Sequence, residues 1–289
     1  MKYGAIFPQY ELDGSVETIR TFMTEVERMG YDFVLAYDHV LGANPEREGG
    51  WRGPYTHENQ FHEIFSLFTY ASAITTELEF ATGILILPQR QTALAAKQAA
   101  QLDIFSNGRL RLGVGVGWNK VEMEGLGEDF STRGKRSAEQ VEVMNLLWQN
   151  ELVTYEGEFH TLDDVGIKPL PIQRPIPVWF GGRADAVVNR MARLGAGWMP
   201  GGMSPEAAAP VVEKLHVALA ENERDPADFG IDPFIGLHRI EGGESGQDAY
   251  IDQWRELGAT HASILSMHGG NTHVDQHLGD LEAFISRVK

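Results

Sequence analysis

The sequence predicts an α/β protein, a single (β/α)8 TIM barrel that spans residues 1–289 and carries a hairpin insertion after the fourth helix. Short apolar runs alternate with longer segments of helical periodicity along the whole chain, which is typical of a parallel sheet with crossover helices. Eight such units can be counted, and 289 residues is an ordinary length for a one-domain barrel.

The short apolar runs are the predicted barrel strands. Most of them end at proline, glycine or polar residues, which interrupt regular structure. The third run contains Thr82-Gly83, and a glycine inside a buried strand indicates a bulge or a close backbone approach. The predicted strands cover residues 3–7, 33–36, 78–87, 109–118, 177–180, 198–199, 229–240 and 261–267.

Segments with helical spacing of apolar residues fill the gaps between these runs. The first holds Ile19, Phe22 and Val26 on one face and ends before Gly30. Ser131 is the predicted N-cap of the fourth long helix, and residues 121–127 before it are predicted as a short irregular turn. The predicted helices cover residues 16–26, 63–75, 92–105, 131–148, 184–194, 205–222, 249–257 and 274–288.

Two segments break the alternation. Residues 41–60 contain Pro45, Gly49-Gly50 and Gly53-Pro54 with little periodicity, so we expect a long loop at the end of the second strand. Long loops at that end of a barrel are usually functional. Residues 153–159 alternate with a period of two, which predicts the hairpin insertion, and a proline-rich connector leads on to Pro177.

Composition excludes several classes of function. The 41 acidic and 24 basic residues give a formal charge of −17, which argues against general binding of nucleic acid or anionic membranes. The absence of cysteine excludes structural disulfides and thiolate metal sites and is compatible with a reducing compartment. No apolar run resembles a signal peptide or a membrane span, so we expect a soluble cytoplasmic protein.

Residues 109–118 are predicted to form a central strand with two unlike faces. One face carries branched side chains and the other carries bare backbone, because Leu110, Leu112, Val114 and Val116 alternate with Gly113, Gly115 and Gly117. Two interpretations stay open at this point. Either a neighbouring element packs tightly on the bare face, or a flat ligand lies over the carboxyl end of the strand.

Polar and glycine-rich groups follow the predicted strands, where a barrel carries its chemistry. Such a rim exposes backbone N–H and C=O groups to a large planar ligand. Asp38-His39 is either a proton-handling pair or a structural hydrogen bond, and Gly181-Gly182-Arg183 is either a phosphate site or a simple turn. The groups expected at this mouth are Asp38-His39, Thr82-Gly83-Ile84, Gly117-Trp118, Gly181-Gly182-Arg183 and Gly201-Gly202.

The remaining motifs give negative or less specific predictions of function. The glycine repeat at 113–117 lies inside a strand and not in a first strand-turn-helix unit, so it is no dinucleotide-binding fingerprint. His273 and His277 are four residues apart, a spacing that suits zinc, but a solvated helix face is the favoured interpretation, and no metal ligand is predicted. Trp51, Tyr55 and His57 of the long loop either cover an apolar substrate or anchor the loop.

Taken together, these residues resemble the luciferase-like monooxygenase superfamily, and more closely its branch of deazaflavin (coenzyme F420)-dependent oxidoreductases. The resemblance covers almost the whole chain. Val116 and Trp118 depart from the pattern, because members place an Arg or an acidic residue there. The segments that carry the resemblance are Tyr37-Asp38-His39 and residues 81–84, 108–118, 155–159 and 175–182.

The resemblance implies a flavin or deazaflavin lying across the carboxyl-terminal mouth. Asp38 would then hydrogen-bond the ring, His39 would handle a proton beside it, and Gly83-Ile84 would form a non-prolyl cis peptide behind it. Phe180 to Arg183 and the Gly117-Trp118 end would hold the ribityl chain and phosphate. The cofactor-binding residues implied are Asp38, Thr82, Gly83, Ile84, Gly115, Gly117, Trp118, Phe180, Gly181, Gly182 and Arg183.

We therefore expect an oxidoreductase that transfers a hydride between coenzyme F420 and a small organic substrate, with His39 as the catalytic residue and Trp51, Tyr55 and His57 at the substrate. An FMN-dependent monooxygenase that uses oxygen and a separate flavin reductase is the alternative within the family. A non-catalytic flavin-binding protein and a metal-dependent hydrolase are alternatives from other classes. The family also implies a homodimer.

Overall fold

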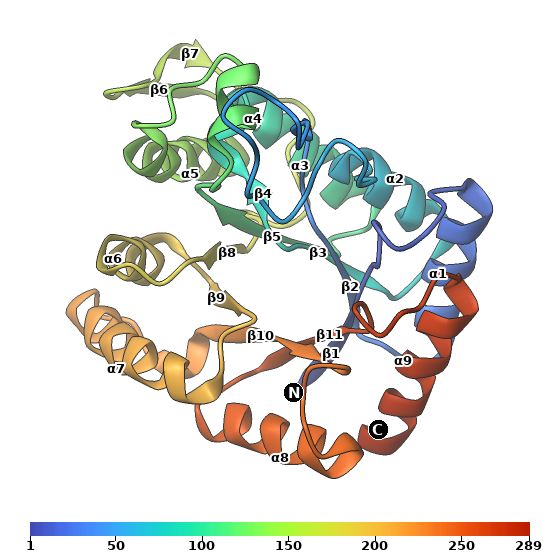
Figure 1. The fold of residues 1–289 in the computed structure, drawn as a ribbon. Coiled ribbons are helices and arrows are strands. Elements are labelled where there is room, and N and C mark those ends of the chain that lie inside the picture. The colour runs from blue at the N-terminus through green and yellow to red at the C-terminus, as the bar shows by residue number, and fades with distance from the viewer.

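The computed structural model describes all residues from Met1 to Lys289 and contains a closed parallel β-barrel surrounded by helices (Figure 1). This arrangement confirms the predicted (β/α)8 barrel. The barrel strands are β1 (Lys2–Ile6), β2 (Phe33–Ala36), β3 (Glu79–Thr82), β4 (Leu85–Ile86), β5 (Leu110–Gly115), β8 (Val178–Gly181), β9 (Gly197–Gly201), β10 (Gly230–Gly236) and β11 (His261–Leu265).

The strands follow one another around the barrel in the order β3-β2-β1-β11-β10-β9-β8-β5. Pairing of β3 with β5, with Phe80 opposite Leu110, closes the ring. The predicted third strand is divided in two: β3 ends at Thr82, and β4 resumes at Leu85 and also pairs with β5. The break falls at Gly83, where the sequence indicated a bulge.

Helices cover the outside of the barrel, as Figure 1 shows. None of them combines the length and the apolar composition that a membrane crossing needs. The helices are α1 (Val16–Arg28), α2 (Ile64–Ile74), α3 (Thr92–Phe105), α4 (Lys120–Gly125), α5 (Arg133–Gln149), α6 (Asp185–Leu194), α7 (Pro205–Glu221), α8 (Gly243–Glu256) and α9 (Val274–Val288).

Three predictions about helices are wrong. Residues 121–127 hold the short helix α4 instead of an irregular turn, because the Asn119 side chain accepts the Glu122 N–H at 3.1 Å and caps its start. Ser131 does not cap α5, since its hydroxyl donates to Asp129 Oδ1 at 2.7 Å. Finally, α8 begins six residues before the predicted 249, because Gly243 and Gly246 lie within its first turns and concealed them.

The long loop lacks regular structure, whereas the hairpin segment forms its own pair of strands. No helix or strand lies between Ala36 and Ile64, which confirms the predicted loop. Strands β6 (Val153–Glu156) and β7 (Thr161–Val165) form a separate antiparallel pair after α5, at the outer edge of the molecule (Figure 1). Glu139 on α5 anchors the turn between β6 and β7, since its carboxylate accepts the N–H groups of Glu158 and Phe159 at 2.9 Å each.

The core is divided by the barrel wall. A large apolar cluster of 61 buried residues lies mainly between strands and helices, and eight further buried residues, including Phe33, Trp179 and Met199, fill the barrel interior. Arg111 also points inward near the amino-terminal end, where it lies 2.9 Å from Asp232 and 4.4 Å from the ring centroids of both Phe33 and Trp179. The barrel is therefore packed solid at this end.

The bare face of β5 is covered by side chains of neighbouring strands. A Cβ at Gly113 would lie 2.6 Å from Met199 Sδ, and a Cβ at Gly115 would lie 1.7 Å from Ile84 Cδ1. At Gly117, where φ is +75°, a Cβ would come within 2.6 Å of Ile86 Cγ2. Tight packing, the first of the two interpretations of this face, therefore accounts for these glycines.

Candidate active site

A cavity of about 780 Å³ opens at the carboxyl ends of the barrel strands. This volume suits a cofactor or a drug-sized ligand. Of the predicted site residues, those in its wall are Asp38, His39, Tyr55, Gly83, Ile84, Gly117, Trp118, Gly181 and Gly182. Thr82, Gly115 and Phe180 do not line the cavity, and neither do Arg183, Trp51 and His57.

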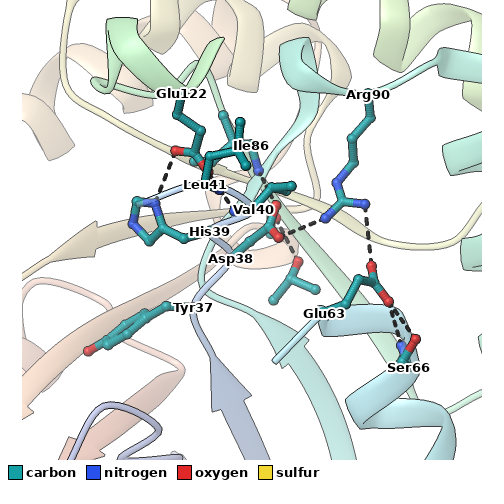
Figure 2. A network of polar contacts seen from close by, with 12 residues as sticks. Tyr37, Asp38, His39, Val40, Leu41, Glu63, Ser66, Ile86, Arg90 and Glu122 are labelled. Carbon is teal, nitrogen blue, oxygen red and sulfur yellow. Dashed lines mark hydrogen bonds and ion pairs between the residues drawn. The ribbon is translucent and has the colours of Figure 1, made fainter. Parts of the chain in front are cut away.

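His39 follows β2 and is oriented by Glu122 of α4. Its Nδ1 lies 3.1 Å from Glu122 Oε2, as Figure 2 shows. Because an ionised carboxylate can only accept, Nδ1–H is the donor, and Nε2 of the neutral ring carries the free lone pair. Nε2 points away from Glu122 and has no hydrogen-bond partner in the protein. His39 thus lies in the cavity wall with only one ring nitrogen engaged by the protein.

Glu122 is fully buried, and its carboxylate is satisfied entirely by this chain. Oε1 accepts the backbone N–H groups of Val40 at 2.5 Å and Leu41 at 3.1 Å, while Oε2 accepts from Asn119 Nδ2 at 3.2 Å. Burial alone would raise the pKa of Glu122, but the hydrogen bond from His39 and those from the two amides lower it below its usual range. Glu122 is therefore held as a carboxylate beside His39.

Asp38 points the other way, into a polar network at the edge of the barrel (Figure 2). Its Oδ1 accepts from Arg90 Nη2 at 2.7 Å and its Oδ2 accepts the Ile86 N–H at 3.0 Å. Arg90 also reaches Glu63 at 3.3 Å. Burial raises the pKa of Asp38, and the charge of Arg90 opposes that rise. Since its side chain is 1% exposed, Asp38 mainly joins the ends of β2 and β4.

The floor of the cavity lies at the break between β3 and β4. The Gly83–Ile84 peptide is cis, as the family resemblance implied. The Ile84 side chain covers Gly115 and reaches toward Gly181, where a Cβ would lie 3.0 Å from Ile84 Cδ1. Beneath it, Thr82 Oγ1 donates to the Gly113 carbonyl at 2.6 Å and is fully buried. The floor is therefore apolar.

Aromatic rings surround His39 on the side of the long loop. The ring centroids of Phe61, Tyr55 and Trp118 lie 4.7, 5.0 and 5.9 Å from that of His39. Trp51 packs on Trp118 at 5.8 Å, and its Nε1 donates to the Tyr55 carbonyl at 2.7 Å. The geometry of Trp51 agrees with the loop-anchor interpretation, whereas Tyr55 itself faces the cavity.

The opposite rim is rich in glycine. Gly182, with φ of +109°, and Gly202 line the cavity, and no atom lies within 4 Å of a Cβ built at Gly202. The Gly182 carbonyl accepts from Trp198 Nε1 at 2.7 Å, which fixes this turn. Arg183 lies beyond the wall, so the turn reaches the cavity through its backbone. Phe180 is buried in the core below it.

The two histidines of α9 do not share a solvated face. His277 is fully buried, with Nδ1 3.0 Å from Ser266 Oγ, whereas His273 is exposed and caps the helix. The interpretation as a solvated face is therefore wrong for His277. No group of three or more His, Asp or Glu side chains is arranged to hold a metal ion. The His57 side chain lines a separate cavity of about 140 Å³.

Sequence reasoning missed several residues of this site. Glu122 and Arg90 lie 83 and 52 residues from their partners His39 and Asp38, and only the folded barrel brings them together. The Asn119 cap three residues before Glu122 was the one local signal for α4. Tyr10 and Arg239, which also line the cavity, had no local signal.

Residues 4–279 match the family described as luciferase-like monooxygenase. The chain belongs to the luciferase-like monooxygenase family. Members of this family are oxidoreductases and monooxygenases, so the His39 cavity at the carboxyl ends of the strands is the candidate active site of a redox enzyme.

Among curated relatives of this luciferase-like protein, an uncharacterized protein of Mycobacterium tuberculosis is 40% identical over 146 residues, 50% of each chain. The FMNH(2)-dependent dimethylsulfone monooxygenase of Pseudomonas putida is 31% identical over 213 residues, 72% of this chain and 55% of the relative. The matches thus span about half the length of these curated relatives.

Two solved structures of similar fold are the monooxygenase RslO1 from Streptomyces bottropensis and the coenzyme F420 dependent tetrahydromethanopterin reductase from Methanopyrus kandleri. RslO1 has a TM-score of 0.81 at 19% identity, with 99% of this chain and 98% of RslO1 covered. The reductase has a TM-score of 0.77 at 17% identity, with 100% and 99% covered. At these identities the likeness extends to the luciferase-like fold alone.

Proposed function

We propose that the protein is an oxidoreductase that transfers a hydride between coenzyme F420 and a small organic substrate, with His39 as proton donor and acceptor. The observation that carries this proposal is the His39–Glu122 pair. Glu122 occupies Nδ1 at 3.1 Å, which leaves Nε2 available in the wall of the cavity. General acid–base chemistry needs such a group within reach of the reacting atoms.

The residues present fit a tricyclic ring with a phosphorylated tail. Ile84, Ile86 and Val116 offer an apolar surface for a flat ring. Gly182 and Gly202 lack Cβ atoms at the opposite rim, so a phosphate can approach their backbone there. We propose that the ring lies over Gly83-Ile84 and the tail lies toward Gly181-Gly182.

A bound deazaflavin would supply the hydride acceptor or donor. When a substrate alcohol is oxidised, His39 Nε2 takes the hydroxyl proton, and in the reverse direction it returns that proton to the carbonyl oxygen. Glu122 stabilises the imidazolium that forms, because its carboxylate is the acceptor of Nδ1–H. Tyr55, Phe61 and Trp118 exclude water from the ring of His39.

A second candidate is an FMN-dependent monooxygenase that receives reduced flavin from a separate reductase. The likeness to the FMNH(2)-dependent dimethylsulfone monooxygenase, 31% identity over 213 residues, favours it. This reaction uses the same cavity and the same apolar floor. The two candidates differ in the cofactor that binds more tightly and in the need for oxygen.

Anaerobic titration of the purified protein with F420 and with FMN, followed by ring absorbance, tests the proposal. We expect tighter binding of F420 and hydride exchange without oxygen. His39→Asn should abolish most turnover while it leaves cofactor affinity within a few fold, and His216→Asn, an exposed histidine on α7, is the matched control. Tighter FMN binding with strict oxygen dependence would instead support the monooxygenase. Binding of either cofactor without turnover would support a non-catalytic binding protein.

A further inference from the structure

Arg239 lines the active-site cavity without a partner. It follows β10 and is exposed, and its side chain forms no hydrogen bond or ion pair within the chain, although Glu241 lines the same wall. No other Lys or Arg lines the cavity. In a chain with a formal charge of −17, an arginine left unpaired at a ligand cavity is available to an anion.

The backbone holds Arg239 in place while its charge stays free. The turn after β10 is closed by the Arg239 N–H, which donates to the Gly236 carbonyl at 3.0 Å. Gln247 of α8 donates to the Leu237 carbonyl in the same turn at 3.0 Å. A Cβ at Gly236 would lie 3.2 Å from Arg239 Cδ, so glycine there leaves room for the arginine stem.

Arg239 shares the cavity wall with three tyrosines, Tyr10, Tyr37 and Tyr55. Burial raises the pKa of Tyr10, Tyr37 and Tyr55, and the positive charge of Arg239 opposes that rise at all three hydroxyls. Tyr10 packs on Tyr55 with 5.3 Å between ring centroids, and Tyr55 packs on His39 at 5.0 Å. A chain of ring contacts therefore runs from Tyr10 through Tyr55 to His39 in the same cavity wall as Arg239.

We infer that Arg239 is a specificity-determining residue that binds the anionic group of the substrate, and that the enzyme acts on small aromatic or apolar organic acids. Two N–H groups of the guanidinium match the two oxygens of a carboxylate. The body of the acid would pack on Tyr10, Tyr37 and Phe234, which places its far end toward His39. This inference rests on the proposed function, because it requires the cavity to be the reaction site.

Benzoate and its neutral isostere benzamide test the inference by calorimetric titration of the chain, with and without F420. The variants are Arg239→Gln and Arg239→Lys, with Lys214→Gln on the surface of α7 as the matched control. Wild type should bind benzoate at least about tenfold more tightly than benzamide, since a charged hydrogen-bonded pair is worth that much. Arg239→Gln should abolish the preference, Arg239→Lys should keep part of it, and Lys214→Gln should retain it. F420 affinity should stay within twofold throughout.

Equal affinity of wild type for the two probes, or no benzoate binding at millimolar concentration, would overturn the inference. So would an Arg239→Gln variant that loses F420 affinity but keeps the benzoate preference, because Arg239 would then hold an anionic group of the cofactor. The proposed function fails separately, through absence of F420 binding, and the titration without F420 still reads the role of Arg239. Thermal melting of each variant shows whether it is folded.

Discussion

The two ends of the barrel interior each hold a cationic or basic side chain against a buried carboxylate, but they use the pair differently. At the amino-terminal end, Arg111 is enclosed by Asp232, Phe33 and Trp179. At the carboxyl-terminal end, His39 is held by Glu122 on one nitrogen only. The enclosed pair lies within the packed interior, whereas the open pair leaves one ring nitrogen of His39 without a protein partner in the cavity wall. What distinguishes the two pairs is access to the cavity, because His39 lines the cavity and Arg111 does not, whereas burial of the carboxylate is common to both.

The largest effect is expected from a substitution that breaks the open pair of His39 and Glu122. His39→Asn removes the proton-handling group, and kcat/KM should fall by about 10²- to 10⁴-fold, which is the usual contribution of general acid–base catalysis. Steady-state kinetics under saturating cofactor measure this, with thermal unfolding as the check on folding. An activity within twofold of wild type would exclude His39 from proton transfer.

The next largest effect is expected from a substitution that breaks the enclosed pair of Arg111 and Asp232. Arg111→Met removes the cation beside the buried Asp232 and leaves Ser263 Oγ as its side-chain donor at 2.9 Å, so the free energy of unfolding should fall by about 3–5 kcal/mol. Urea unfolding measures this change. The double variant Arg111→Met with Asp232→Leu is the control and should regain most of the loss. A fall below about 1 kcal/mol in the single variant would contradict this account.

A third test keeps His39 and changes its partner Glu122, so that the contribution of the partner to the open pair is measured by itself. Glu122→Gln keeps the shape of the partner but removes its charge, and a misaligned imidazole should lower kcat by up to about 100-fold with little change in KM. Separate measurement of kcat and KM distinguishes positioning from binding. A raised KM with unchanged kcat would indicate that α4 contributes to substrate binding instead.

The smallest effect concerns His261, which packs on Trp179 at 4.9 Å near the enclosed end. Burial, and then the charge of Arg111, lower the pKa of His261 to about 3. The unfolded chain, with an ordinary value of 6.5, therefore takes up a proton that the folded chain refuses as the pH falls below about 6.5. Between pH 7 and pH 5, wild type should lose about 1–2 kcal/mol more unfolding free energy than His261→Phe. Urea unfolding of the two proteins across this pH range measures the difference. Equal losses of unfolding free energy in the two proteins would contradict the prediction.

The strands were predictable because each is a short, largely buried and mostly apolar run between breakers. Phe33–Ala36 was predicted without error, and β11 differs by two residues at its end. Elements that lack this signal were predicted with wrong bounds or as a turn. The first turns of α8 contain Gly243 and Gly246, and α4 is too short to show a periodicity.

The site was predictable only in part, for a physical reason. His39 and Gly83-Ile84 stand next to strands, so their position at the mouth follows from the barrel itself. The positions of Glu122, the partner of His39, and of Arg90, the partner of Asp38, do not follow from it, because these residues lie 83 and 52 positions further along the chain. Arg183 shows the converse: it follows β8, yet its side chain lies outside the wall.

Glu122 also joins the long loop to the ring of His39. Its Oε1 accepts the N–H groups of Val40 and Leu41, where the loop begins, and its Oε2 faces His39. Any excursion of the loop that detaches these amides must also loosen the acceptor of the imidazole. Displacement of the loop start and loss of the alignment of His39 are therefore mechanically coupled through one carboxylate.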